Sequence, residues 1–145
     1  MTAQTRTASP PDYAAFIAAL RLYNIGLKES SCSLDRDEYW KTDAEKKLDY
    51  KLTSKSNGQD KKHFDAESTL SLTLCGERPN SPVLRLSATF DLHFHGESIT
   101  KEFVQQFCGS EIRLIVWPYF REFVTNMTAR MHIPPVILPL SDKDR

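Results

Sequence analysis

The chain has 145 residues, the size of one domain with a substantial core. Its nineteen basic and nineteen acidic residues cancel, so no net charge attracts it to nucleic acid or anionic lipid. The polar start MTAQTRTASPPD is unlike an export signal, and no apolar segment is long enough to cross a bilayer, so we expect a cytoplasmic protein without membrane insertion.

The first predicted element is a short amphipathic helix. Residues 1–10 are polar and expected to be disordered. The sequence SPPD at 9–12 is a typical helix start, with a capping serine, proline in the first turn and an acid. Apolar residues then recur at helical spacing at Tyr13, Phe16, Ile17 and Leu20.

Four strands are predicted next, because the apolar period changes to two. Tyr23, Ile25 and Leu27 should share one face of the first strand, which runs towards Ser33. Segments 44–52, 63–74 and 84–94 alternate apolar and polar residues more clearly. Asn-Gly in KSNGQDK predicts the hairpin turn after the second strand, and GERPNSP the turn after the third. One apolar and one wet face per strand indicate an antiparallel sheet.

Helices follow the strands. Thr100 can cap a short helix that Gly109 ends, and a longer helix runs from about Ser110 to Met131, where HIPPVILPL stops it. Pro118 either kinks this helix or lies in the first turn of a helix that starts near Trp117, and the pattern leaves both open. The order predicts an α+β fold: a four-stranded antiparallel sheet with the long C-terminal helix on one face and a short N-terminal helix.

The long helix has two apolar stripes. One can cover its own sheet and comprises Val116, Trp117, Phe120, Phe123, Val124, Met127 and Met131. The other, with Ile112, Ile115 and Tyr119, has nothing to pack on in a lone domain, and burying each such side chain is worth about 1.5–3 kcal/mol. The helix is therefore predicted to lie between its sheet and another subunit of a symmetric oligomer. The interface candidates are Ile112, Ile115, Trp117, Tyr119 and Phe120.

The segment IRLIVWPYFREFVTNMTARMHIPPVILPL resembles the signature of the SecB family of protein-export chaperones. In that family an apolar run reaches a Pro-Tyr pair, an Arg-Glu pair follows, and the helix leads to a proline-bearing ending. A first strand around LRLYNIGLKES, a crossover reaching Trp40 and three antiparallel strands extend the resemblance over roughly residues 20–140. The matching positions are Pro118, Tyr119, Arg121, Glu122, Arg130, Pro134, Pro135 and Leu138.

The resemblance implies a single SecB-like domain over residues 11–140, followed by a flexible tail at 141–145. It implies a homotetramer, built as a dimer of dimers, and an ATP-independent holdase chaperone that binds non-native polypeptides in hydrophobic grooves. The usual export chaperone is acidic and has a further C-terminal helix and a tail that contacts SecA, whereas this chain has no net charge and stops at SDKDR. Export of unfolded preproteins with SecA as partner is therefore left open. The shortened form resembles the SecB-like chaperones of toxin–antitoxin systems, whose client is an antitoxin.

Client-binding candidates are large side chains outside the strand pattern, because a chaperone needs exposed apolar surface. Tyr39 and Trp40 lie in the charged stretch DRDEYWKTD, and Ile99, Phe103 and Phe107 lie in or before the short helix. Core packing is the alternative for all five, and we favour it for Phe103 and Phe107.

An enzyme is the competing class, because a sheet gripping a helix also builds small-molecule-binding and thioesterase-like domains. Such an enzyme needs a buried acid or base, and the long helix offers only Glu122 beside Arg121. His93 and His95 could seed a metal site, but no acid or thiol is placed to complete it. Catalytic motifs are lacking, so we expect no catalytic residue, metal or cofactor. The three separated cysteines, Cys32, Cys75 and Cys108, are predicted to be reduced.

Overall fold

The computed structural model describes residues 10–41, 45–76, 78 and 80–141. Residues 1–9 and 142–145 lie outside these residues, and they include most of the N-terminal segment predicted to be disordered and of the predicted flexible tail. The predicted helix cap Ser9 and Ala44, the first residue of the predicted second strand, also lie outside them. The elements in chain order are α1 (Pro10–Ala19), β1 (Arg21–Leu34), α2 (Arg36–Lys41), β2 (Lys47–Gln59), β3 (His63–Cys75), β4 (Pro82–His95), α3 (Lys101–Gly109) and α4 (Ile112–Arg130).

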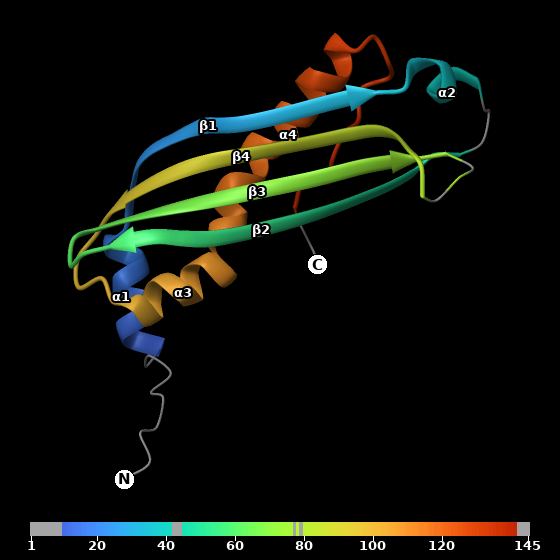
Figure 1. Ribbon diagram of the computed structural model, residues 1–145. Helices are drawn as coiled ribbons and strands as arrows, with labels where there is room; N and C mark the ends of the chain where they lie inside the picture. The colour runs from blue at the N-terminus through green and yellow to red at the C-terminus, as the bar shows by residue number, and fades with distance from the viewer. Residues whose placement is uncertain (1–9, 42–44, 77, 79, 142–145) are drawn as a thin grey trace.

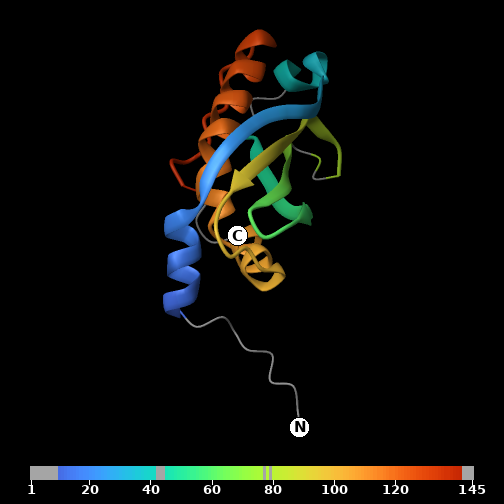
Figure 2. The same cartoon turned by 90° about the vertical axis from the view of Figure 1, so that its left-hand side faces the viewer.

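The strands form one antiparallel sheet in the order β1-β4-β3-β2, so β1 and β2 are its edges. Helix α4 lies on one face of this sheet, with α2 at one end of the molecule and α1 and α3 at the other (Figures 1 and 2). The predicted α+β fold, with a long C-terminal helix on one face and a short N-terminal helix, is confirmed.

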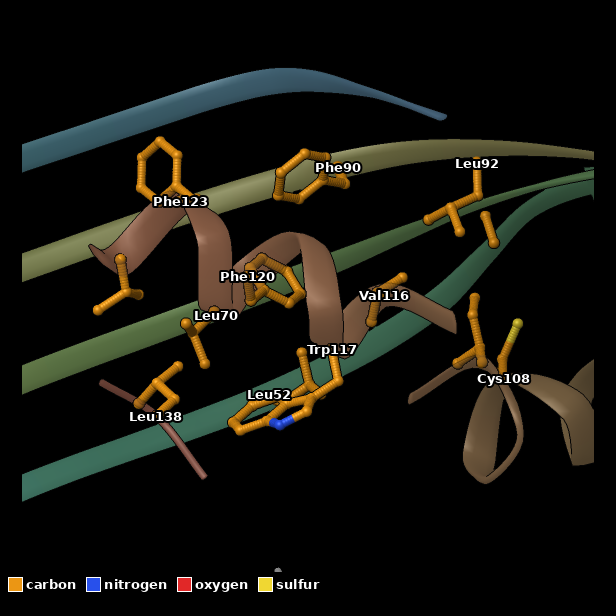
Figure 3. Close-up of a cluster of buried hydrophobic side chains, with 14 of the residues drawn as sticks. Leu52, Leu70, Phe90, Leu92, Cys108, Val116, Trp117, Phe120, Phe123 and Leu138 are labelled. Carbon is orange, nitrogen blue, oxygen red and sulfur yellow. The ribbon is translucent and has the colours of Figure 1, made fainter. Parts of the chain in front are cut away.

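The core lies between α4 and the sheet (Figure 3). Val116, Phe120 and Val124 of α4 are fully buried against apolar residues that alternate along the strands, such as Leu70 and Leu92. The hydrophobic effect is the main stabilisation that these side chains provide. Because each strand buries only one of its two faces, the alternation of apolar and polar residues predicted the strands well.

Helix α4 is continuous from Ile112 to Arg130 with Pro118 inside it, so no new helix starts near Trp117. Proline has no backbone N–H, so the carbonyl of Leu114 loses its usual helical partner. Both Leu114 and Pro118 are exposed, so water can replace the missing bond.

The hairpin between β2 and β3 turns later than predicted. Strand β2 continues through Asn-Gly to Gln59, and the reversal is fixed by Asp60, whose Oδ1 accepts hydrogen bonds from the N–H groups of Lys62 and His63, each at 2.8 Å. The bond from Lys62 is the main reason that the pKa of Asp60 lies below its ordinary value. The Asn-Gly pair instead forms a bulge, in which the strand register skips Asn57 and Gly58 has φ at 152°. The predicted turn position was wrong because glycine's positive φ serves bulges as well as turns.

Replacing Gly58 with alanine is expected to lower the free energy of unfolding by about 1–3 kcal/mol, because its φ is strained for any side chain. Gly26→Ala is the matched control, since Gly26 has an open surrounding and no such φ. Urea unfolding measures both. Equal effects at the two positions would show that the bulge conformation carries no strain.

Strand β1 also differs from the prediction. A bulge at Tyr23 shifts its pairing with β4, and each such shift moves the following residues to the other face. Tyr23 therefore lies on the solvent face, where its ring stacks on His95 with centroids 4.6 Å apart. Leu22, Ile25 and Leu27 lie on the helix-bearing face, opposite buried β4 residues. The prediction that Tyr23 shares a face with Ile25 and Leu27 was wrong.

Candidate functional site

The five interface candidates on α4 fall into two groups. Ile112, Trp117 and Phe120 are fully buried within their own chain and offer no area to a partner. Helix α3 packs against β2 and α4, and Ile112, at the start of α4, belongs to the same buried core as the apolar residues of α3. Ile115 is half-buried and Tyr119 is 39% exposed, so these two alone present surface.

Tyr119 continues an apolar surface that begins on β1, and Ile115 lies one helical turn before Tyr119 on the same side of α4. The Tyr119 ring lies 6.0 Å from that of Phe90, centroid to centroid. Phe90 pairs across the sheet with Leu27, which is 49% exposed. In a lone chain this surface meets water beside an edge strand, an arrangement that proteins usually cover. We call it the β1–α4 strip, made of Leu22, Ile25, Leu27, Ile115 and Tyr119.

Helix α2, which was not predicted, displays an aromatic ring to solvent. Asp35 starts the helix: its carboxylate accepts from the N–H of Glu38 at 3.1 Å. Trp40 is 58% exposed and stands edge-on to buried Tyr39, with ring centroids 5.0 Å apart. The Lys46 ammonium lies 4.2 Å from the centre of the Tyr39 ring and helps to hold it. The buried tyrosine thus supports an exposed tryptophan.

The other client-binding candidates lie in the core. Ile99, Phe103 and Phe107 are buried. Phe103 stacks on Phe16 at 5.2 Å, as expected for the core packing that we favoured for it. They lie by α3, at the opposite end of the sheet from α2 (Figure 1). The structure therefore does not bring them together with Trp40.

An extended C-terminal segment runs back along α4 after the helix ends (Figure 1). We use this name for residues 132–141, which form neither helix nor strand. His132 has φ at 58° at the point where the chain reverses. Ile133 and Leu138 are buried, whereas Ile137 and Leu140 are 72% and 83% exposed.

Side chains of α4 hold this segment by its backbone. Trp117 Nε1 donates to the Pro139 carbonyl at 2.8 Å. Arg121 Nε donates to the Leu138 carbonyl at 3.2 Å. Thr125 Oγ1 donates to the Val136 carbonyl at 3.3 Å. The donor row Trp117, Arg121 and Thr125 was missed from sequence, although its spacing of four residues was visible.

One concave surface, the groove between β2 and α3, offers little for catalysis. This groove has a volume of about 650 Å³, with Ser54, Lys101 and Cys108 among its lining residues. Its described lining contains no Asp, Glu or His. Burial raises the pKa of Cys108 to about 11, which disfavours a thiolate nucleophile. Glu122, the acid offered by α4, is exposed to solvent.

The histidines on the solvent face of the sheet pair with acids and rings. His93 Nδ1 lies 2.5 Å from Asp65 Oδ1, and His95 contacts Tyr23 and His63. Within the part of the chain that the structure describes, no group of three or more His, Cys, Asp or Glu is placed to hold a metal, and no helix is long and apolar enough to cross a membrane. The three cysteines are free, as predicted.

The architecture described above is a SecB-like fold, and comparison with solved structures confirms the fold that the C-terminal motif predicted. The chain is similar to the SecB-like chaperone Rv1957 of Mycobacterium tuberculosis, solved in complex with a ChAD peptide from the Rv1956 HigA1 antitoxin. The TM-score is 0.66 and the identity 21%, covering 85% of this chain and 91% of that one. A protein of unknown function from Streptococcus agalactiae is less similar, with a TM-score of 0.47, 13% identity and coverage of 83% and 96%. No protein-family model and no curated protein matches the sequence.

Proposed function

We propose that the protein is an ATP-independent holdase chaperone that binds non-native polypeptides through exposed apolar surface. The observation that carries the proposal is that a SecB-like fold presents a large aromatic side chain, Trp40, to solvent. Such surfaces engage extended chains with little sequence readout. Neutral net charge adds no preference for acidic or basic clients.

An antitoxin is the favoured client. Support comes from the similar chaperone Rv1957, which was solved with a peptide from an antitoxin. Unfolded preproteins bound for export, with SecA as partner, are the alternative client class for the same surface. Co-expression separates the two: an antitoxin client becomes soluble when the chaperone is present, whereas a preprotein client becomes exported.

We also propose that a second copy of the chain covers the β1–α4 strip. In the described structure β1 pairs with β4 alone, which leaves its outer backbone edge and its apolar side chains uncovered. A symmetric homo-oligomer buries this surface on both partners at once. The homotetramer implied by the SecB resemblance, a dimer of dimers, is the expected assembly.

A helix-grip enzyme is disfavoured by the groove between β2 and α3. Acyl transfer or hydrolysis needs a positioned base or nucleophile. Cys108 is a poor nucleophile there, and Glu122 of α4 is outside in solvent. Binding of one compact acyl ligand per chain, without any effect on protein aggregation, is the behaviour that would favour an enzyme.

Trp40→Ala is expected to weaken client binding about tenfold, because exposed aromatic anchors dominate the energy of such contacts. The client probe is reduced and carboxamidomethylated α-lactalbumin, a permanently unfolded chain, and its binding is followed by fluorescence anisotropy without nucleotide. Lys41→Ala is the matched control, since Lys41 is an exposed neighbour in the same helix. Unchanged affinity in Trp40→Ala would remove α2 from the binding surface.

A further inference from the structure

The contact between α4 and the C-terminal segment has the character of peptide binding. The three bonds from the donor row all end on main-chain carbonyls. A fourth bond runs the other way, from the Val136 N–H to Thr128 Oγ1 at 2.9 Å. Hydrogen bonds to backbone groups do not depend on the side chains of the bound segment. The donor row can therefore bind extended segments of many different sequences.

The side chains of the segment are also arranged as in a bound peptide. Leu138 is 1% exposed, and Figure 3 draws it in the same buried cluster as Leu52 and Trp117. Its neighbour Ile137 is 72% exposed. Only Ile133 and Leu138 are buried as anchors, while Ile137 and Leu140 meet water. A strand or helix of the core would instead be covered by its neighbours.

The prolines of the segment separate it further from the sheet. Pro134, Pro135 and Pro139 have no N–H, so the segment cannot form a full ladder with a strand edge. Its attachment therefore depends on side-chain donors of α4 and on few anchors. Such an attachment can open without unfolding the sheet.

We infer that α4 and the adjoining sheet form a sequence-tolerant site for an extended polypeptide, and that the C-terminal segment occupies this site as an internal ligand that clients displace. The inference rests on the proposed chaperone function. A client with a large apolar side chain and free carbonyls meets the same anchor pocket and the same donors. Its apparent affinity is reduced by the fraction of chains in which the internal segment is bound.

Leu138→Asp tests the inference because it weakens the internal ligand and leaves the donor row intact. A carboxylate cannot enter the apolar anchor pocket without a large desolvation cost. Ile137→Asp is the matched control, with the same added charge on the adjacent exposed residue. Reduced and carboxamidomethylated α-lactalbumin is expected to bind Leu138→Asp about tenfold more tightly than it binds the wild type, and Ile137→Asp like the wild type.

The outcomes separate this inference from the proposed function. If the wild type binds the unfolded probe and Leu138→Asp binds no more tightly, the internal ligand is overturned and the chaperone proposal stands. If neither the wild type nor the variants bind the probe, both are overturned.

Hydrogen exchange of the wild-type chain gives a second test that does not depend on the folding of a variant. The Val136 amide is the reporter, because its bond to Thr128 exists only while the segment is docked. Saturating unfolded α-lactalbumin is expected to accelerate exchange at Val136. Unchanged or slower exchange would show that the client binds elsewhere.

Discussion

Replacing Phe120 with alanine is expected to lower the free energy of unfolding by about 3–5 kcal/mol, a range typical of large aromatic side chains removed from a core. Phe120 is fully buried between α4 and the sheet, and its ring meets Phe90 edge-on with centroids 5.1 Å apart. Alanine leaves a cavity there that neither the sheet nor the helix can close without moving. Urea unfolding of the purified chain, followed by circular dichroism, measures the change.

Glu122→Ala is the control for this prediction, because Glu122 is exposed on the same helix. It is expected to change the free energy of unfolding by less than about 0.5 kcal/mol. A loss below about 1 kcal/mol in Phe120→Ala, similar to that of the control, would contradict the placement of this stripe of α4 in the chain's own core.

Leu27→Asp is expected to dissociate the oligomer into single chains of 16.6 kDa. Leu27 is at the centre of the β1–α4 strip, paired with Phe90 and 49% exposed in the lone chain. A carboxylate buried at an interface without a partner costs several kcal/mol, and a two-fold axis places this cost on both subunits. Light scattering coupled to size exclusion measures the mass directly.

Asn24→Asp provides the comparison for the assembly prediction, since Asn24 lies on the same strand opposite His93, on the solvent face. It adds the same charge and should leave the mass of the oligomer unchanged. A Leu27→Asp oligomer of wild-type mass would place the interface elsewhere, and a monomeric wild type would overturn the proposed assembly.

The sheet was largely predictable from sequence, whereas its irregularities were not. Strands β3 and β4 each bury every second residue along most of their length, and this alternation is visible in the sequence. A bulge breaks the alternation at one residue without leaving a compositional mark, so Tyr23 was placed on the wrong face. The Asn-Gly pair at Gly58 gave the correct backbone requirement, a positive φ, but the wrong structure.

The site was less predictable, because it depends on what packs on each helix. Helical periodicity places Ile112 and Tyr119 on one stripe, but it cannot show that the first is covered by its own chain and the second is not. Helix α2 had a usable signal in the capping pair Asp35 and Glu38. The docking of the C-terminal segment on Arg121 had no such signal, since the proline-rich sequence alone predicts only that the helix ends.

Aggregation of a thermally unfolded protein, followed by light scattering without ATP, tests the chaperone proposal most directly. Citrate synthase heated with an equimolar amount of this chain should stay clear, and the scattering should return when Trp40→Ala replaces the wild type at the same concentration. The proposal would be contradicted by wild-type samples that scatter as strongly as citrate synthase heated alone.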